Sequence, residues 1–254
     1  MQKEMYPAIF KRKAFHTFKL AEEAKISSKE LRDIERAFKT FKPLIKDIKT
    51  AIKIVPAKGP GLKRDAEYCI LLYSEKKDNS LINIGYLGEQ LDLYLASKNI
   101  GALWFGFGRP KVKVLDDLHF VIMIAIGKIV DPTQFRTKKS ERKRLSVEEI
   151  WKGETLGIAE VARLAPSACN SQPWRVENKD GVITVYRHNK TSNFLKIAAF
   201  IAFNYNRIDI GIFLCFLELA LKEKDIKYTR ELFVDEGRRK DKFTKVAQYK
   251  LTSE

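Results

Sequence analysis

NIGYLGEQLDLYLASKNIGALW, at residues 83–104, is the most informative stretch of the chain, because a stretch of the same kind follows later. Gly101 stands where a helix over this stretch is expected to stop. The later stretch, DIGIFLCFLELALKEKDIKYT at residues 209–229, has the same shape and also leads into a strand-like run. From Asn83 to Asp209 the shift is 126 positions. The apolar residues of the first stretch recur at helical spacing: Ile84, Leu87, Leu91 and Leu95.

A second pair of segments repeats at nearly the same shift. SSKELRDIERAFKTFKPL, at residues 27–44, opens with a capping serine and continues as an amphipathic helix. Its counterpart is GIAEVARLAPSACNSQPW, at residues 157–174, and Leu31 and Ile158 lie 127 positions apart. Two unrelated helix–strand units of similar length would be the alternative explanation. The agreement of two shifts in the same order favours an internal duplication.

The strand-like runs complete the prediction of an α+β fold. The first two runs are dense in aliphatic residues and should be buried, whereas the third alternates and should be half-exposed. We expect two related α+β halves, residues 1–139 and 140–254, with mixed or antiparallel sheets and flanking helices. Such halves should pack as a pseudo-dimer, and a site at their junction would draw residues from both. The runs are 67–73, 120–127, 181–187, 226–234 and 246–251.

Composition limits the class of protein. A hydrophobic fraction of 45% is ample for a buried core, so disorder is not expected. The net charge of +16 would suit a nucleic-acid or anionic-membrane partner, or a solvated Lys-rich surface. Because the charge is spread along the chain, we predict neither a nucleic-acid nor a membrane partner.

The location expected for the chain is the cytoplasm. No apolar run approaches the roughly 20 residues of a membrane span, and the first residues do not resemble a signal peptide. Three scattered cysteines lack metal-ligand or redox spacing, so no metal site is predicted. Two of them lie in apolar runs and should behave as small hydrophobic residues. A reduced protein is therefore expected.

Several polar side chains lie close together in LAPSACNSQPW, at residues 164–174. Proline interrupts the preceding helix, and the Ser and Asn side chains can pair with either donors or acceptors. Such a loop suits the edge of a flat heterocycle that presents alternating N–H and C=O groups. The same residues would also be compatible with a plain polar turn.

The loop closely resembles the Ala-Pro-Ser-x-x-Asn-x-Gln-Pro-Trp signature of the nitroreductase family, whose members hold FMN at a dimer interface. The resemblance implies that Gln172–Trp174 anchor the loop and the strand that follows. It also implies that four residues line the isoalloxazine ring: Pro166, Ser167, Ala168 and Asn170.

Two further segments resemble the family's phosphate-binding regions. FKRKAFHTF, at residues 10–18, is similar to the basic opening of the family, and SERKRLSVEEI, at residues 140–150, is similar to its basic closing segment. Ala14 and Ser146 depart from the family's usual Ser and Pro, and a histidine stands where Arg or Lys is usual. The cations implied to hold the FMN phosphate are Arg12, Lys13, His16, Arg142 and Arg144.

A fourth match is NIGALWFGFG, at residues 99–108, which resembles the Gly-rich strand end beside the reactive flavin N5. By this resemblance Phe105 and Gly106 lie nearest the ring. Taken alone, the stretch would be an aromatic strand end that packs in a core. RAFKTFKPL, at residues 36–44, is the first half's counterpart of the ring-binding loop and lacks its Ser and Asn. One good FMN site and one degenerate site are expected, as in a fused, duplicated branch of the family.

The resemblance implies an FMN-dependent NAD(P)H oxidoreductase. Hydride would pass from NADH or NADPH to FMN, and then to an electron-poor small molecule such as a nitroaromatic or a quinone, with ping-pong kinetics. No catalytic side chain is predicted, and the chain would be a monomeric pseudo-dimer or a homodimer. A non-redox protein that binds a phosphorylated ligand or nucleic acid is the alternative. A specialised flavin reaction, such as reductive dehalogenation or flavin breakdown, is another.

Overall fold

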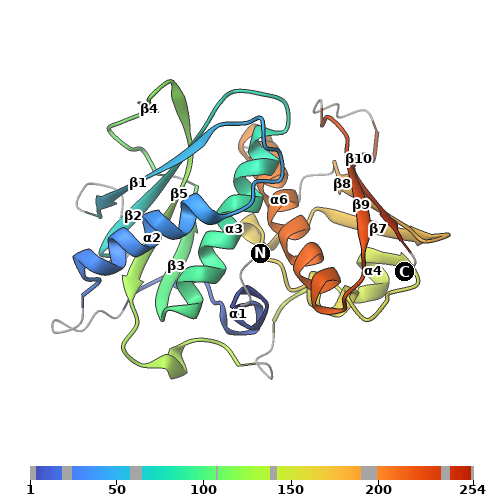
Figure 1. The fold of residues 1–254 in the computed structure, drawn as a ribbon, viewed down its shortest axis with the longest axis horizontal. Helices are drawn as coiled ribbons and strands as arrows, with labels where there is room; N and C mark the ends of the chain where they lie inside the picture. The colour runs from blue at the N-terminus through green and yellow to red at the C-terminus, as the bar shows by residue number, and fades with distance from the viewer. Residues whose placement is uncertain are drawn as a thin grey trace. The chain divides into compact units, whose positions relative to one another are not determined.

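The computed structural model describes residues 4–18, 25–57, 65–106, 108–137, 142–189, 199–235 and 241–252, drawn as a coloured ribbon in Figure 1. These residues form two compact units. The first comprises residues 1–80 and 87–140, and the second comprises residues 81–86 and 141–254. The expected boundary between residues 139 and 140 lies outside the described residues.

The first unit is built on an antiparallel sheet with the strand order β1-β2-β5-β3, to which the short β4 adds by pairing with the start of β5. Strands β2 and β5 are the central pair, and most of their residues are buried, as their aliphatic runs predict. Helix α2 contacts β1. The elements are α1 (Met5–Lys11), α2 (Ser28–Thr40), β1 (Thr50–Pro56), β2 (Tyr68–Ser74), α3 (Ser80–Ser97), β3 (Ile100–Phe105), β4 (Val114–Leu115), β5 (Leu118–Lys128) and the 3-10 turn η1 (Pro132–Gln134).

The second unit repeats this topology. Its sheet has the order β6-β7-β8-β10-β9, in which β6 pairs parallel to β7 and all other pairs are antiparallel. In both units an antiparallel strand pair, β1–β2 or β7–β8, is followed by a long helix, and the last strand of the unit then inserts beside the second strand of that pair. Strand β5 lies between β2 and β3, and β10 lies between β8 and β9. The elements are α4 (Val147–Ile150), β6 (Trp151–Gly153), α5 (Ala159–Ala162), the 3-10 turn η2 (Ala168–Asn170), β7 (Trp174–Lys179), β8 (Val182–His188), α6 (Ala199–Glu223), β9 (Tyr228–Leu232) and β10 (Phe243–Leu251).

The predicted α+β class is confirmed, with antiparallel ladders and one parallel strand pair. The expected half-exposure of residues 181–187 is wrong. Most of β8 is buried, and even Arg187 has an exposed fraction of 0%. Its guanidinium donates to both carboxylate oxygens of Asp235, at 2.5 and 2.8 Å, and this pairing makes its burial tolerable.

The expected role of Gly101 as a helix stop is also wrong. Helix α3 ends at Ser97, and Asn99 takes the left-handed conformation, with φ of 58°. Gly101 instead lies in β3, where a Cβ atom would come within 2.9 Å of the side chains of Ile129 and Phe15. The glycine is therefore required by strand packing rather than by the helix end.

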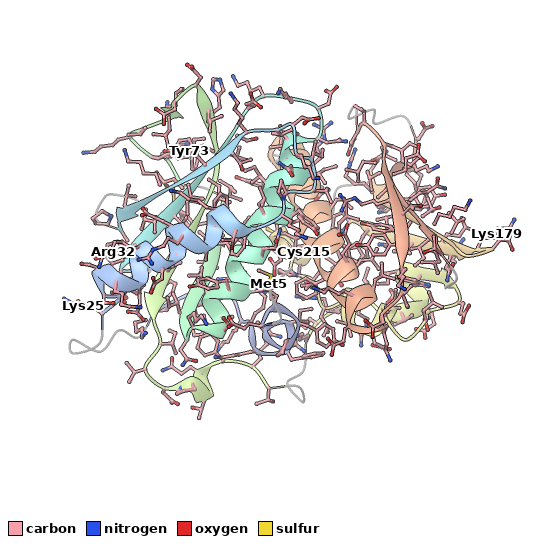
Figure 2. All side chains as sticks on the ribbon, in the orientation of Figure 1. Met5, Lys25, Arg32, Tyr73, Lys179 and Cys215 are labelled. Carbon is pink, nitrogen blue, oxygen red and sulfur yellow. The ribbon has the colours of Figure 1, made fainter. Side chains whose placement is uncertain are left out.

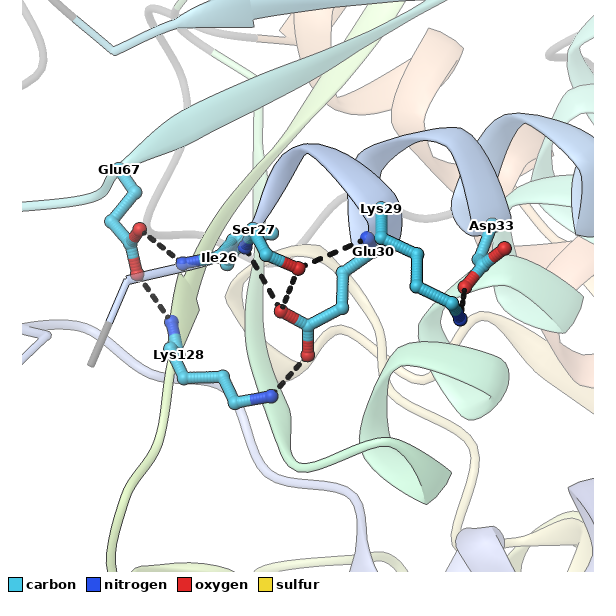
Figure 3. A network of polar contacts seen from close by, with 7 residues as sticks. All are labelled: Ile26, Ser27, Lys29, Glu30, Asp33, Glu67 and Lys128. Atoms are coloured by element: carbon cyan, nitrogen blue, oxygen red, sulfur yellow. Dashed lines mark hydrogen bonds and ion pairs between the residues drawn. The ribbon is translucent and has the colours of Figure 1, made fainter.

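Figure 3 shows how the start of α2 is tied to the sheet of its unit. Ser27 and Glu30 form a capping box, as the opening serine predicts. The carboxylate of Glu67 accepts from the backbone N–H groups of Ile26 and Lys128, each at 2.7 Å. The side chain of Lys128 in turn bonds to Glu30. One carboxylate thus joins the residues before α2 to the end of β5.

Helix α6 crosses the first turns of α3 at two glycines, within the second unit. A Cβ atom at Gly85 would lie 2.0 Å from the carbonyl oxygen of Ile208, and one at Gly211 would lie 1.9 Å from that of Ile82. The two glycines are 126 positions apart, and so are the two isoleucines that they meet. The crossing is therefore reciprocal, and the two glycines allow the same close backbone approach.

A buried polar cluster lies further along α6. Glu218 accepts hydrogen bonds from the hydroxyl groups of Tyr86, at 2.8 Å, and Tyr249, at 2.9 Å. Arg230 donates to the same carboxylate at 2.5 Å. Glu218 is 4% exposed and interrupts the apolar run Ile210–Leu221 of this helix. The carboxylate binds the helix, the start of α3 and the sheet into one polar network.

The cysteines behave as predicted from their neighbours. Cys69 on β2 and Cys215 on α6 are free and buried, and Figure 2 places Cys215 within its helix. Burial raises the pKa of the Cys69 thiol to about 11. Cys169 is exposed. Among the helices that the structure describes, none has both the length and the apolar character needed to cross a membrane.

We expect Gly211→Ala to destabilise the protein by about 3 kcal/mol or more, because its Cβ would overlap a backbone oxygen that cannot move alone. Alanine otherwise favours a helix by about 1 kcal/mol over glycine, so the sign of the effect is diagnostic. Gly181→Ala is the control, since a Cβ there meets nothing within 4 Å and only the positive φ is strained. It should cost about 1–2 kcal/mol. Urea denaturation measures both, and a variant Gly211→Ala as stable as the wild type would contradict the crossing.

Candidate functional site

The loop at residues 166–172 connects α5 to β7 in the second unit. It holds the turn η2, and three of its residues have positive φ: Cys169 at 51°, Asn170 at 57° and Gln172 at 46°. Each such residue costs on the order of 1–2 kcal/mol for an L-amino acid. The loop therefore keeps this conformation only because its surroundings hold it.

Part of that support is internal. The Ser167 hydroxyl accepts from the backbone N–H of Gln172 at 2.9 Å, which closes the loop on itself. The Gln172 side chain is buried and accepts from the backbone N–H of Leu145 at 2.8 Å. Trp174 is fully buried and stacks on Phe213 of α6, with ring centroids 5.0 Å apart. Residues Gln172–Trp174 thus anchor the loop and the strand that follows.

Asp209 of α6 also holds the loop, through two hydrogen bonds. One carboxylate oxygen accepts from the backbone N–H of Ala168 at 2.9 Å, and the other accepts from the Ser171 hydroxyl at 3.2 Å. Asn206, one turn earlier, lies 3.4 Å from the same hydroxyl. Asp209 is 3% exposed, and burial raises its pKa to about 7, in spite of the two hydrogen bonds, which lower it.

Arg144 approaches the loop from the segment before α4. Its guanidinium donates to the side-chain oxygen of Asn170 at 2.8 Å and to the carbonyl of Leu164 at 3.4 Å. Arg163 donates to the carbonyl of Leu145 at 3.2 Å. Contacts of the described side chains therefore bring Arg144 and Asn170 together with Ser167 and Ala168. Pro166 belongs to the same loop and is partly exposed, as is Arg142.

Arg12 has a different setting, in the first unit. It follows α1 directly, is 7% exposed, and ion-pairs with Asp92 at 2.8 Å and Glu89 at 3.6 Å. Trp104 donates to the same Asp92 carboxylate at 3.0 Å. Burial lowers the pKa of Arg12, but the two carboxylates outweigh it and raise the pKa above its ordinary value. Two acidic side chains thus already compensate this arginine.

The other candidates of the first unit lie along or near β3. Ala14 bridges to Ala102, so the N-terminal segment runs beside this strand, and Phe105 ends it, with Gly106 in the turn that follows. Lys13 is partly exposed and donates to the carbonyl of Gln134 at 3.0 Å. His16 is exposed. Among the described residues, no cluster of His, Cys, Asp or Glu could hold a metal ion.

Sequence reasoning overlooked Asp209 as a site residue. The available signal was a carboxylate that directly precedes the apolar run Ile210–Leu217 of α6. Reasoning from sequence also missed the partners of Arg12, because Asp92 lies 80 positions away and on another element.

A comparison with known families decides the relationship. The model of the family described as "Putative TM nitroreductase" matches residues 4–221. The chain belongs to this nitroreductase family. The resemblance predicted from the loop signature is thereby confirmed.

One solved structure shows the same fold, and two others are more distantly similar. A "putative nitroreductase" from Thermotoga maritima superimposes with a TM-score of 0.63 at 20% identity, covering 99% of this chain and 95% of that one. A nitroreductase from Desulfovibrio desulfuricans in complex with FMN has a TM-score of 0.44 at 16% identity, covering 61% of this chain and 99% of that one. One from Desulfitobacterium hafniense with bound FMN has a TM-score of 0.40 at 13% identity, covering 59% and 97%. No curated protein sequence matches significantly.

The stability of this nitroreductase-family chain should depend on pH through Asp209. The pKa of Asp209 is about 7 in the folded state against an ordinary 3.8, so the folded protein holds the proton more tightly than the unfolded chain. The contribution of Asp209 to the free energy of unfolding is therefore greatest below about pH 4 and falls as the pH rises to 7. From pH 5 to pH 7, the wild type should therefore lose about 2–3 kcal/mol relative to Asp209→Asn, which does not titrate.

Urea denaturation of both proteins at several pH values measures this difference, and all groups that they share cancel in it. Asp180→Asn, at an exposed turn position, is the matched control. A stability difference between wild type and Asp209→Asn that stays constant from pH 5 to pH 7 would show that Asp209 is ionised throughout.

Proposed function

We propose that the chain is an FMN-dependent NAD(P)H oxidoreductase of the cytoplasm, which reduces electron-poor small molecules such as nitroaromatics or quinones. The observation that carries the proposal is the loop at residues 166–172. It bears the family's ring-binding signature and is held in a strained turn by contacts from two other segments, the residues before α4 and helix α6. The proposal further takes the two units, with one topology, as products of an internal duplication.

The loop fits the edge of a flavin ring in chemical type. The Ser167 oxygen accepts from Gln172, so its own hydrogen remains available for donation to a ligand. The side-chain oxygen of Asn170 accepts from Arg144, and the exposed amide group beside it can donate. Pro166 and Ala168 add apolar surface next to these donors. We propose that these four residues face the ring, with Phe105 and Gly106 near its reactive edge.

The candidate cations differ in how well they could bind a phosphate group. Lys13, His16, Arg142 and Arg144 remain partly or wholly exposed and can meet a dianion. Arg12 is buried between two carboxylates, so its charge is already compensated. We propose that Arg12 fixes the N-terminal segment beside β3 and that Lys13, which follows it, provides the direct contact.

The chain's own part in the reaction is to bind and orient. Bound FMN would supply the redox chemistry, accepting hydride from NADH or NADPH and passing it to the acceptor. Arg144 and Asn170 would fix the position of the ring edge, and Ser167 would donate a hydrogen bond to it. Because donor and acceptor would use the same space in turn, ping-pong kinetics are expected. No side chain is proposed to form a covalent bond.

One observation favours a second candidate, a non-redox protein that binds another phosphorylated ligand. The compensation of Arg12 and the exposed His16 leave fewer permanent cations for a phosphate dianion than the family's usual opening provides. Such a protein would bind polyanions in a salt-sensitive way and retain no flavin.

A visible absorption spectrum tests the proposed function. The purified protein is incubated with FMN, desalted, and then mixed anaerobically with NADH or with NADPH. We expect a flavin band that co-elutes with the protein and bleaches with at least one nicotinamide. Free FMN passed through the same column without protein is the control. A protein fraction without flavin would contradict the oxidoreductase and leave the second candidate.

A comparison of Lys13→Ala with Arg12→Met separates the two cations. Loss of one charge-assisted hydrogen bond of about 1.5–3 kcal/mol should weaken FMN binding by about tenfold to a hundredfold in Lys13→Ala. Its stability should barely change. Arg12→Met leaves Asp92 and Glu89 buried without their cation, and should cost about 3–5 kcal/mol of stability.

FMN titration by fluorescence and urea denaturation measure the two effects. Lys29→Met, which removes an exposed ion pair with Asp33, is the control for loss of a lysine and should change neither quantity appreciably. If Arg12→Met had unchanged stability but no longer bound FMN, Arg12 rather than Lys13 would be the residue that contacts the phosphate.

A further inference from the structure

The Asp209 carboxylate is unfavourable at this position in the fold, because burial removes it from water. It lies on a helix whose neighbouring residues Ile208, Ile210 and Gly211 are apolar and buried or closely packed. Burial of a charged carboxylate costs several kcal/mol unless other groups compensate it. No cation of the described part of the chain pairs with it. Its hydrogen bonds go to the loop at residues 166–172 alone: one from Ala168 and one from Ser171.

These two bonds flank the strained turn. Ala168 immediately precedes the left-handed pair Cys169 and Asn170, and Ser171 immediately follows it. A side chain with two oxygens that holds both sides of the turn can offset the conformational cost of its left-handed residues, because each of the two hydrogen bonds contributes to stability.

The first half provides an internal comparison. Asn83 occupies the position 126 residues before Asp209, and it is likewise buried. The loop counterpart at residues 36–44 has neither the Ser nor the Asn of the ring-binding loop, and α2 continues through its first part to Thr40. The chain thus has a carboxylate where the Ser and Asn of the loop are present, and an amide where they are absent.

We propose that Asp209 is a positioning residue of the flavin site, which holds the turn Cys169–Asn170 in its ligand-binding shape from beneath. The part that concerns flavin rests on the proposed function. Asp209 does not contact the ring in this proposal. It fixes the backbone of Ala168 and the hydroxyl of Ser171, and thereby sets the direction in which Ser167 and Asn170 present their donors.

The experiment compares four proteins without flavin and then with it. Asp209→Ala removes both acceptors, whereas Asp209→Asn keeps an oxygen for the Ala168 N–H. Asn206→Ala is the matched control, because Asn206 lies on the same helix and approaches Ser171 but has no bond to Ala168. Hydrogen–deuterium exchange of the loop peptide in the flavin-free proteins reports the turn itself. Titration with FMN then reports its consequence.

We expect the exchange of loop amides to rise by about tenfold or more in Asp209→Ala, as the loss of one to two hydrogen bonds implies, with β7 and β8 unchanged. FMN affinity should fall by a similar factor. Asp209→Asn and Asn206→Ala should stay close to the wild type in both measurements. Normal exchange and FMN affinity in Asp209→Asn, together with their loss in Asp209→Ala, would show that the side chain acts through its hydrogen bonds to the loop.

Two results would overturn the proposal: unchanged loop exchange in Asp209→Ala, or an increase of the same size throughout the second unit. Should Asp209→Ala fail to fold, Ser171→Ala removes one of the two bonds without altering the helix, and faster exchange confined to the loop is then the expected result. A wild type that binds no FMN would instead overturn the proposed function, whereas the exchange measurement would still decide whether Asp209 holds the loop.

Discussion

The close crossing of α6 with the first turns of α3 is the constraint on which the second unit depends. At Gly85 and Gly211 the helices approach so closely that even a methyl group would overlap a carbonyl oxygen of the other backbone. Such an approach fixes rotation and height together, because neither helix can turn without bringing a side chain into the contact. Asp209, two residues before Gly211, is thereby held at one height beneath the loop that it bonds. The reciprocal contacts of Ile82 and Ile208 show that both helices contribute to the crossing in the same way.

Buried charge is the second organising feature. Glu218, Asp235 and Asp92 each accept from an arginine inside the protein, and Glu218 is further bonded to tyrosine hydroxyls. Ion pairs of this kind add little net stability, since desolvation offsets most of the attraction, but losing one partner is costly. They therefore specify which elements meet. Asp209 differs, because its partners are a backbone N–H and a hydroxyl instead of a cation, and burial accordingly raises its pKa to about 7.

The features predicted from sequence are those that depend on local pattern. Helix α3, the buried strands β2 and β5 and the cap at Ser27 follow from residue spacing, and the loop signature identified the family. The prediction for Gly101 was wrong because its small size serves a contact with Ile129, across the sheet, that no local pattern encodes. Arg187 was misjudged for the same reason: a strand residue with alternating neighbours looks exposed until Asp235 is known to lie beside it. Long-range pairing, rather than propensity, set the limit of prediction.

The contacts of the loop also refine what its signature means. The Ser167 hydroxyl bonds to the backbone of Gln172 and closes the loop, and the Gln172 side chain bonds to the backbone of Leu145. These signature residues therefore stabilise the backbone conformation of the loop. In the proposed function, recognition of the ligand then falls to the Asn170 amide and the remaining Ser167 hydrogen. A protein can thus keep the signature for folding while a change beneath it, at Asp209, alters how those donors are presented. Residues 36–44 fit this division of roles, since they lack the Ser and Asn of the loop, and an amide, Asn83, stands 126 positions before Asp209.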